Sequence, residues 1–266
     1  MPPKAIDKQR ILKAITWLGV MLLFFISVGF TSFQHSERKF KSLQINIDDT
    51  AGVNFVTVQQ IKNIVAYKFG DIKKSKLNAI NTAVLESIIE NNPHVANAEV
   101  FSTVDGVLNI YVSQRVPVLR IFNHKGESFY IDNEGYFMPL SDSYTPLVPV
   151  ANGHLTSKLS DHKIRVLTND QMNQALPVEA LFNLVKAIEK DELLKAQLQQ
   201  IYVNSDGNFT LVPRVGNHII YFGNGLDMEA KLQNLLVIYT KGFNMCGWEK
   251  YKTINLKFKD QVVCGY

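Results

Sequence analysis

The longest uninterrupted apolar stretch of this 266-residue chain lies near its start. Residues 14–33, AITWLGVMLLFFISVGFTSF, contain no charged side chain. At about 1.5 Å per residue, a helix of this length rises roughly 30 Å, the thickness of a bilayer's hydrocarbon core. We therefore predict a transmembrane helix over residues 14–33, with a cytoplasmic tail (1–13) before it and a juxtamembrane stalk (34–41) after it.

A cleaved secretory signal is the alternative interpretation of this segment. Signal sequences carry an apolar stretch of about 7–15 residues that ends in small residues at the cleavage site. The stretch here is longer and ends in bulky residues, Phe30 and Phe33, which favours an uncleaved anchor. Four basic residues lie in the tail and three in the stalk, and this asymmetry predicts a cytoplasmic N-terminus with the remaining chain exported.

The pattern over residues 42–117 predicts a compact module of one strand, two helices and two more strands. Residues 42–47 alternate between apolar and polar positions, as a half-buried strand does. Two stretches with helical spacing follow, and the first opens with a capping-box pattern, Thr57 to Gln60. The apolar faces expected to be buried are Val58, Ile61 and Val65 in the first helix and Leu77, Ile80, Val84 and Ile88 in the second.

Two short strands, 95–103 and 107–113, complete this module. Asp105-Gly106 between them is a hairpin turn signal, because glycine adopts positive φ without strain. A unit of this order packs two helices on one face of a three-stranded sheet.

Residues 118–266 are rich in short strands, with two interrupting helices. Pro177 is a favourable first helical residue, so one helix is expected over 178–195, with its charged residues in solvent, and another over 227–241. The expected strands that bracket these helices are 200–204, 209–213, 218–222, 253–259 and 261–266, the last two joined by a turn at Lys259-Asp260. The expected fold class is α+β: a transmembrane helix, the module of 42–117, and a mostly antiparallel β domain with flanking helices over 118–266.

The positive charge of the chain belongs to its N-terminal end. Residues 1–33 hold four Lys/Arg and one Asp, a net charge of +3, whereas the other 24 Lys/Arg and 23 Asp/Glu give only +1. A nucleic-acid-binding domain needs a basic face, so the near-neutral exported part argues against that class of function.

Candidate catalytic and metal-binding residues do not form a convincing site. Ser160-Asp161-His162-Lys163 fits the Ser-x-x-Lys pattern of penicillin-binding enzymes, but so does Ser36-Glu37-Arg38-Lys39, and the accompanying motifs are missing. The six histidines are scattered without ligand spacing: His35, His94, His124, His154, His162 and His218. We therefore expect no catalysis, no metal and no cofactor.

The two cysteines, Cys246 and Cys264, are too few for a disulfide framework. One bridge between them is possible in an oxidising compartment and would stabilise the fold by about 3 kcal/mol. Two unpaired, partly buried thiols are the alternative.

The last predicted strand, 261–266, is the feature that suggests a binding function. A strand at the edge of a sheet has unpaired amides and carbonyls and can accept a strand from another chain. The alternative is an edge that is blunted by charge, which Lys257, Lys259 and Asp260 would allow.

Several motifs, taken in order, resemble the FtsQ/DivIB family of bacterial cell division proteins. The module of 42–117 looks like a POTRA domain, and 92–100 (NPHVANAEV) is similar to the family's Pro-x-Val-x-x-Ala-x-Val stretch. The other similar segments are 108–118 (LNIYVSQRVPV), with Gln114 where glutamate is usual, 128–137 (SFYIDNEGYF) and the closing 254–258 (INLKF). The resemblance covers almost the whole chain.

The resemblance implies a non-enzymatic divisome scaffold at the septum, anchored in the cytoplasmic membrane, that links early and late division proteins. It implies that the terminal edge strand pairs with FtsB, itself joined to FtsL, to regulate septal peptidoglycan synthesis, and that the POTRA domain meets upstream division proteins. Position by position, the partner-binding residues would be Lys257, Phe258, Lys259, Asp260, Gln261, Gly265 and Tyr266. Phe258 stands where the family has tyrosine and Tyr266 where it has tryptophan, while Asp260 and Gln261 replace serine and glycine.

Two other functions fit the sequence less well. A POTRA-bearing component of protein export or outer-membrane assembly requires many amphipathic strands of about ten residues, which the helices at 178–195 and 227–241 interrupt. A membrane-anchored cell-wall enzyme requires a nucleophile beside a base, which the motifs do not supply.

Overall fold

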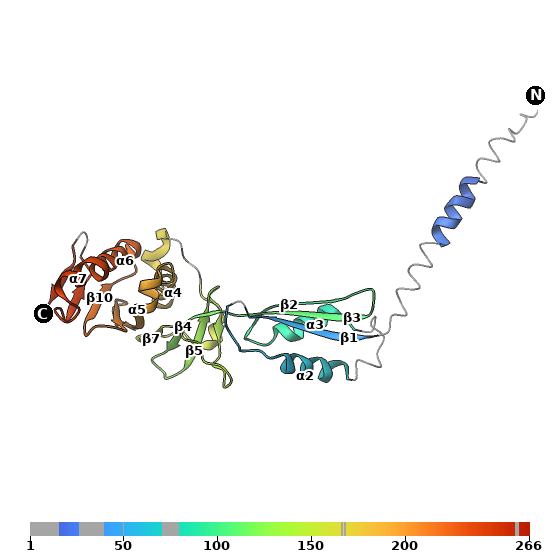
Figure 1. Ribbon diagram of the computed structural model, residues 1–266, viewed down its shortest axis with the longest axis horizontal. Coiled ribbons are helices and arrows are strands. Elements are labelled where there is room, and N and C mark those ends of the chain that lie inside the picture. The colour runs from blue at the N-terminus through green and yellow to red at the C-terminus, as the bar shows by residue number, and fades with distance from the viewer. Residues whose placement is uncertain are drawn as a thin grey trace, which may run out of the picture. The chain divides into compact units, whose positions relative to one another are not determined.

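The computed structural model describes residues 16–26, 40–49, 51–70, 80–165, 167, 169–258 and 261–266 (Figure 1). Residues 16–26 form a helix whose side chains are all exposed. The rest of the predicted transmembrane segment, residues 14–15 and 27–33, lies outside the described residues. Among the helices that the structure does describe, none combines the length and the apolar character needed to cross a membrane.

Two compact units make up the described chain. The first comprises the described residues of Met1–Ile47, Thr57–Asn92 and Asn97–Ser113, and the second those of Asp48–Val56, Pro93–Ala96 and Gln114–Tyr266. Residues 48–56 and 93–96 therefore belong to the second unit although they lie, in sequence, among the elements of the first.

A three-stranded sheet and two helices form the POTRA-like part of the chain. The elements follow in the order β1 (Ser42–Asp48), α2 (Val58–Phe69), α3 (Thr82–Glu90), β2 (Val95–Ser102) and β3 (Val107–Gln114). In the sheet, β3 lies between β1 and β2. The predicted hairpin is confirmed, because the Thr103 N–H donates to the Val107 carbonyl oxygen at 2.9 Å around the Asp105-Gly106 turn. The predicted order of one strand, two helices and two strands is thus confirmed.

Side-chain caps mark the start of both helices. At α2 the predicted capping box is present: the Gln60 N–H donates to Thr57 Oγ1 and the Thr57 N–H to Gln60 Oε1. At α3 the Asn81 side chain accepts from the Val84 N–H, and the helix begins at Thr82.

The face predicted to be buried in the second helix is only partly right. Ile80 is buried, although it precedes α3, and Leu77 lies outside the described residues. Val84 and Ile88 are not buried, and the neighbouring residues Leu85 and Ile89 are buried instead.

A nine-stranded sheet dominates the second unit, in the order β12-β11-β10-β9-β8-β7-β4-β5-β6. Along the chain its strands are β4 (Pro117–Phe122), β5 (Ser128–Asp132), β6 (Phe137–Met138), β7 (Val150–Gly153), β8 (Leu198–Val203), β9 (Phe209–Pro213), β10 (Ile219–Gly223), β11 (Thr253–Asn255) and β12 (Val263–Gly265). The presence of this large sheet and of the smaller POTRA-like sheet, each with its own helices, confirms the α+β class.

Three pairs of neighbouring strands in this sheet are parallel, and each is joined by a long connection. Strands β7 and β8 are parallel, and between them run η3 (Leu159–Asp161), η4 (Asn169–Gln174), α4 (Pro177–Ile188) and α5 (Glu192–Gln197). Strands β10 and β11 are also parallel, and between them run α6 (Met228–Val237), η5 (Ile238–Gly242) and α7 (Phe243–Cys246). Strands β4 and β7 are the third parallel pair, and the connection between them contains β5 and β6. A parallel neighbour needs a long connection, whereas a tight turn suffices for an antiparallel one.

The hydrophobic core of the second unit lies between one face of this sheet and helices α4 and α6. It contains Leu181 and Val185 of α4, Leu232 and Leu235 of α6, and inward residues of the sheet such as Ile201, Leu211, Ile220, Phe222 and Ile254. Alternate residues of β10 point the other way, so that Ile219 and Tyr221 are exposed while Ile220 and Phe222 are buried. The side chains of β10 thus alternate between the two sheet faces, although all four are apolar or aromatic.

The single helix predicted over 178–195 is two helices. Asp191 interrupts it, because its side chain accepts hydrogen bonds from the Leu193 and Leu194 N–H groups and caps α5. Glu179 was expected in solvent, but it is only 5% exposed. Its carboxylate accepts from the Leu176 N–H at 2.9 Å and pairs with Arg165, which is why a charged residue is tolerated there.

The last two strands are shorter than the predicted 253–259 and 261–266. They are antiparallel as expected, but β11 stops at Asn255 and β12 covers only Val263–Gly265. The Asn255 side chain accepts from the Lys257 N–H at 3.0 Å and turns the backbone away from the strand direction.

Gln114 is buried, and its side chain lies among backbone N–H and C=O groups. It stands where the FtsQ/DivIB-like motif usually has glutamate. Its Oε1 accepts from the Val56 N–H at 2.8 Å, and its Nε2 donates to the Val53 carbonyl oxygen at 2.9 Å. An amide can do both at once, whereas a carboxylate only accepts. Glutamine therefore fits this site better than glutamate.

A second buried polar pair joins Arg115 to Asp132, at a distance of 2.8 Å between Nη1 and Oδ2. The other Asp132 oxygen accepts from the Glu134 and Tyr136 N–H groups and closes the turn after β5. The Arg115 guanidinium and the Lys163 ammonium both lie over the Tyr136 ring, at 4.1 and 3.9 Å from its centre. Two motifs that are separate in the sequence, 108–118 and 128–137, are thus joined by one ion pair.

His218 is buried in an aromatic cluster just before β10. Its Nε2 hydrogen-bonds to the Tyr239 hydroxyl at 3.1 Å, and Phe243 lies 5.2 Å away between ring centres. Nδ1 has no hydrogen-bond partner within the described residues, and Gly216 packs so close that a Cβ there would lie 2.7 Å from the imidazole. Burial lowers the pKa of His218, against the opposing effect of the Glu249 charge.

We expect Gln114→Glu to destabilise the chain at neutral pH. The new carboxylate would face the Val53 carbonyl oxygen without a proton to donate, at a cost of about 2–3 kcal/mol in the free energy of unfolding. Acidification should reduce this loss, because a protonated carboxyl can donate. Urea titration at pH 7 and pH 5 measures both effects, with exposed Gln199→Glu as control. Equal stability of the two variants at pH 7 would contradict the prediction.

We expect the buried His218 to make stability fall as the pH drops below about 6.5, the ordinary imidazole value. In this range the unfolded chain binds a proton that the folded chain resists, so the free energy of unfolding decreases. His218→Gln should therefore show a flatter decline in urea titrations between pH 7 and pH 5. His94, whose pKa burial also lowers, is common to both proteins and cancels in the comparison. Parallel pH profiles for the two would refute this role.

Candidate partner-binding edge of the sheet

The two edges of the nine-stranded sheet differ in whether their backbone is already paired. At the β6 edge, the Phe137 N–H donates to the His162 carbonyl oxygen at 2.8 Å and the Ile164 N–H to Gly135 at 3.0 Å. Tyr136 and Lys163 form an antiparallel bridge between them. Residues 162–164 thus cover this edge as a further short strand would.

The other edge is β12, which pairs with β11 on one side only. No strand of the described residues lies on its outer side. Backbone amides and carbonyls along such an edge are open to pairing with another chain. Of the two sheet edges, β12 is therefore the one that can accept an added strand.

Close packing fixes β12 against β11. Gly265 lies opposite Thr253, Cys264 opposite Ile254 and Val263 opposite Asn255. A Cβ on Gly265 would lie 2.5 Å from the Thr253 hydroxyl, so a larger residue here would require the Thr253 side chain to rotate away. The Gly265 carbonyl also accepts from the Lys252 N–H at 2.8 Å, which continues the pairing past the strand.

A row of side chains crosses the outer face of the sheet and ends at the edge strand. Neighbouring strands place Tyr202 opposite Thr210, Thr210 opposite Tyr221, Tyr221 opposite Asn255 and Asn255 opposite Val263. Tyr202, Tyr221 and Val263 are 40%, 37% and 46% exposed. A strand added beside β12 would continue this row.

The structure brings some of the predicted binding residues to this edge and leaves others around it. Gly265 lies in β12, and Tyr266 follows with 84% of its surface exposed and its ring 5.3 Å from that of Tyr251. Phe258, 50% exposed, lies in the connection between β11 and β12. The exposed Lys257 and Gln261 also lie there, whereas Lys259 and Asp260 are outside the described residues.

Sequence reasoning missed Val263 and the tyrosines of the outer face. Tyr221 carries no clear sequence signal, because residues 219–222 (IIYF) are all apolar or aromatic and their alternation in exposure is seen only in the structure. Val263 could not be found from the sequence either, since its position beside Asn255 depends on the register of two short strands.

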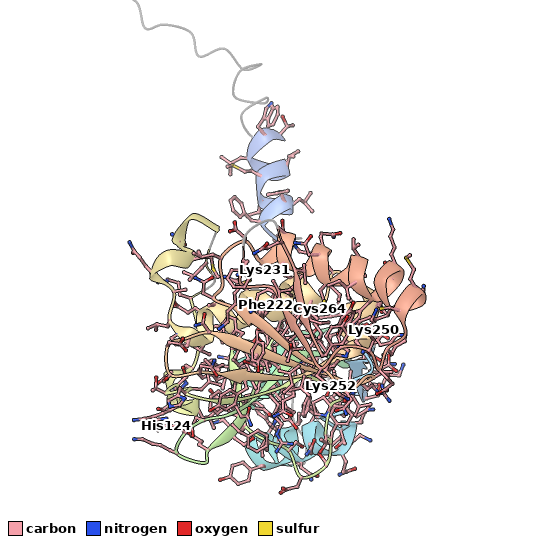
Figure 2. The ribbon with its side chains drawn as sticks, turned by 90° about the vertical axis from the view of Figure 1, so that its left-hand side faces the viewer. His124, Phe222, Lys231, Lys250, Lys252 and Cys264 are labelled. Atoms are coloured by element: carbon pink, nitrogen blue, oxygen red, sulfur yellow. The ribbon has the colours of Figure 1, made fainter. Side chains whose placement is uncertain are left out.

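Lysines surround this end of the sheet, as Figure 2 shows for Lys231, Lys250 and Lys252 near Cys264. The Lys257 ammonium lies 5.9 Å from the centre of the Tyr221 ring. Lys231 donates to the Asn224 carbonyl oxygen, and burial lowers its pKa against the opposing charge of Asp227. Lysines near an edge strand oppose the pairing of two copies of the same chain, because their like charges repel, but they leave the backbone accessible to a partner with complementary charge.

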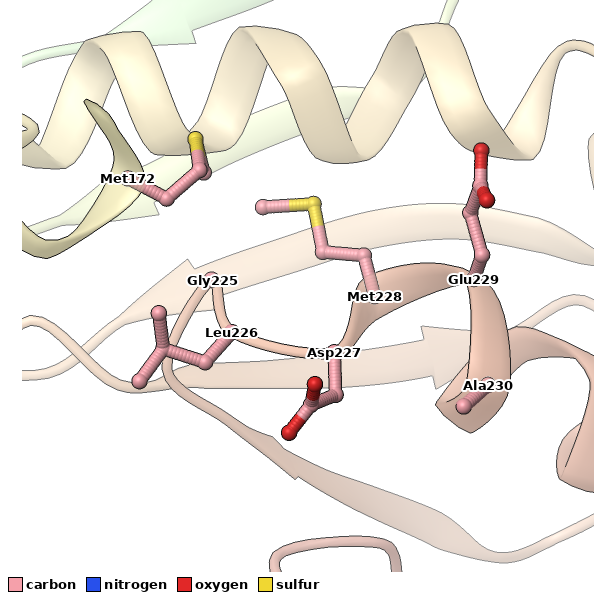
Figure 3. Close-up of a pocket in the computed structure, with 7 residues that line it drawn as sticks. All are labelled: Met172, Gly225, Leu226, Asp227, Met228, Glu229 and Ala230. Carbon is pink, nitrogen blue, oxygen red and sulfur yellow. The ribbon is translucent and has the colours of Figure 1, made fainter. Parts of the chain in front are cut away.

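A hollow of about 380 Å³ at the start of α6 is a poor candidate for chemistry (Figure 3). Its polar groups include the Asp227 and Glu229 carboxylates, and the thioether carbons of Met172 and Met228 close on Gly225. Both carboxylates are exposed, and that of Glu229 pairs with the Lys190 ammonium at 3.0 Å, as side chains on a solvated surface do. In the part of the chain that the structure describes, no three His, Cys, Asp or Glu residues gather as metal ligands would.

Comparison with known sequences agrees with the two units. A family model described as a POTRA-like domain matches residues 38–113, and one described as "FtsQ/DivIB, C-terminal related" matches residues 116–265. The second match covers more than half of the chain and includes every strand of the nine-stranded sheet.

A curated relative gives the same assignment. The chain is 28% identical over 188 residues to the cell division protein FtsQ of Rhodothermus marinus, a match that covers 69% of this chain and 65% of the relative. The aligned region therefore spans slightly less than two thirds of that protein's length. Together with the order of the motifs and the fold of both units, these matches show that the chain belongs to the FtsQ/DivIB family.

Proposed function

We propose that this chain is a non-enzymatic scaffold of the bacterial divisome that captures a membrane-anchored partner by strand addition at β12. The observation that carries the proposal is the asymmetry of the sheet: the β6 edge is already paired by residues 162–164, and the β12 edge is open among the described residues. The family and the name of the Rhodothermus relative, a cell division protein, support cell division as the process.

The partner in this proposal is FtsB, held together with FtsL, and the consequence of capture is control of septal peptidoglycan synthesis. An extended segment of FtsB would pair its backbone with β12, which supplies affinity, while side-chain contacts supply specificity. Phe258 and Tyr266 are the apolar anchors, since both are large, exposed and adjacent to the open strand. Aromatic residues at such positions carry a large share of interface energy.

The placement in the cell is part of the same proposal. Residues 14–33 would hold the chain in the cytoplasmic membrane with its N-terminus inside, and the POTRA-like unit would meet upstream division proteins on the outer side. An anchored partner and an anchored scaffold then share one surface, which raises their effective concentration for each other.

Replacing both anchors, Phe258→Ala with Tyr266→Ala, should weaken binding to FtsB from the same organism at least tenfold. Each truncation removes exposed aromatic surface that the partner would cover, and neither residue is needed for the core. Titration calorimetry or surface plasmon resonance measures the change. Tyr67→Ala is the matched control, because Tyr67 is 95% exposed on α2 and far from β12 in the sequence.

Deletion of residues 261–266, which removes β12, should abolish binding while the POTRA-like unit stays folded. Retention of wild-type affinity by either the truncated chain or the double alanine variant would sink the strand-addition mechanism.

Cells depleted of the protein should form filaments with segregated nucleoids, because septation fails while growth and replication continue. Expression of the full chain should restore normal length, whereas a chain lacking residues 1–33 should not, since it has lost the proposed anchor. Microscopy of depleted and complemented cells, with immunoblots to confirm equal expression, gives the readout. Cells of normal length after depletion would rule out a division function.

A further inference from the structure

Both cysteines of the chain lie at the C-terminal end of the second unit, on elements that the sequence separates. Cys264 is the central residue of the open edge strand β12, and Cys246 is the last residue of helix α7. Both are partly buried free thiols, and both pack against the same hydrophobic core.

A short tether and several contacts hold these two elements together. After Cys246 the chain turns at Gly247, which has a φ of 84°, and reaches Lys252, whose N–H donates to the carbonyl oxygen of Gly265, the residue after Cys264. Between them Trp248 packs on Phe243, 4.9 Å between ring centres, and Tyr251 on Tyr266 at 5.3 Å. Six residues of chain therefore connect the neighbourhood of one thiol to that of the other.

The geometry of the sheet puts Cys264 opposite the buried Ile254, on the face that the core helices cover. Burial raises the pKa of the Cys264 thiol, and the nearby Cys246 raises it further. A raised pKa leaves less thiolate on Cys264 at neutral pH, so Cys246 is the thiol that starts the exchange. The later attack by Cys264 is intramolecular, and its high effective concentration offsets the smaller thiolate fraction. Cys246 Sγ lies 3.2 Å from the Gly242 carbonyl oxygen and remains partly accessible.

We propose that Cys246 and Cys264 form a dithiol site that takes an intramolecular disulfide and so fastens the edge strand β12 to helix α7. The oxidant is a protein or small-molecule disulfide. The Cys246 thiolate attacks one sulfur of that disulfide, breaks its S–S bond and releases one thiol. The Cys264 thiolate then attacks Cys246 Sγ in the mixed disulfide and releases the second thiol. Two electrons and two protons pass from the protein to the oxidant.

The consequence for binding rests on the function proposed above. A three-residue edge strand has few backbone hydrogen bonds to its neighbour, so it loses conformational entropy when a partner strand is added. A disulfide that holds β12 in place beforehand lowers this entropy cost of binding. The oxidised chain is therefore the tighter binder.

The test uses the full chain in detergent micelles, equilibrated with oxidised and reduced glutathione at graded ratios. We expect both free thiols to disappear together, an intrachain link between the peptides that contain residues 246 and 264, and reversal by excess reductant. Thermal unfolding should shift up by roughly 5–10 °C on oxidation. Cys246→Ser and Cys264→Ser are the matched controls, and neither should form the link or shift. Persistent free thiols, two glutathione adducts or links only between chains would overturn the proposal.

Binding to the partner is measured separately in both redox states. We expect the oxidised chain to bind at least about threefold more tightly, and equal affinity would overturn the proposed consequence. If the disulfide forms but the partner binds in neither state, the strand-addition function fails while the dithiol site stands. The thiol and binding measurements thus distinguish the two proposals.

Discussion

The architecture of the second unit depends on one pairing, the parallel contact of β11 with β10. Because parallel neighbours cannot be joined by a tight turn, the chain must leave the sheet after β10 and cross one face as α6, η5 and α7 before it returns. The crossover supplies Leu232 and Leu235 to the core and brings Cys246 to the end of α7. Beyond β11 the chain pairs back as β12, which is the edge of the sheet.

Buried polar groups fix the path of the chain where the strands begin and end. Gln114 binds the backbone of Val53 and Val56, and Asp132 holds both Arg115 and the turn at Tyr136. Each of these groups would destabilise the fold if its partners were lost, so the contacts specify one conformation rather than simply adding stability. The glutamine at 114 illustrates the point, since its environment offers both an N–H and a carbonyl oxygen.

The sequence predicted the features that local chemistry controls. The capping box at Thr57 and the Asp105-Gly106 hairpin both depend on residues close to each other in the chain. One error arose where a side chain overrides the periodic pattern, since Asp191 divides the helix predicted over 178–195. In α3 the apolar residues come in adjacent pairs, Val84-Leu85 and Ile88-Ile89, so that helical spacing fits either member of each pair. For the candidate site, the edge position of the last strand was expected. The shortness of β11 and the role of Val263 were not, because the first depends on the Asn255 side chain and the second on strand register.

A short terminal strand is a weak element by itself and a favourable one for binding. With three residues, β12 is held by its pairing with β11, by the close approach of Gly265 to Thr253 and by the packing of Cys264 on the core. A strand added outside it would turn an edge into an interior position and give Val263 a neighbour on its open side. The lysines around this edge oppose its pairing with a second copy of itself, because like charges would meet. In the proposed complex, a specific partner would pair with the same open backbone that the lysines protect from nonspecific pairing. The binding free energy would then depend on how well β12 is ordered before the partner binds.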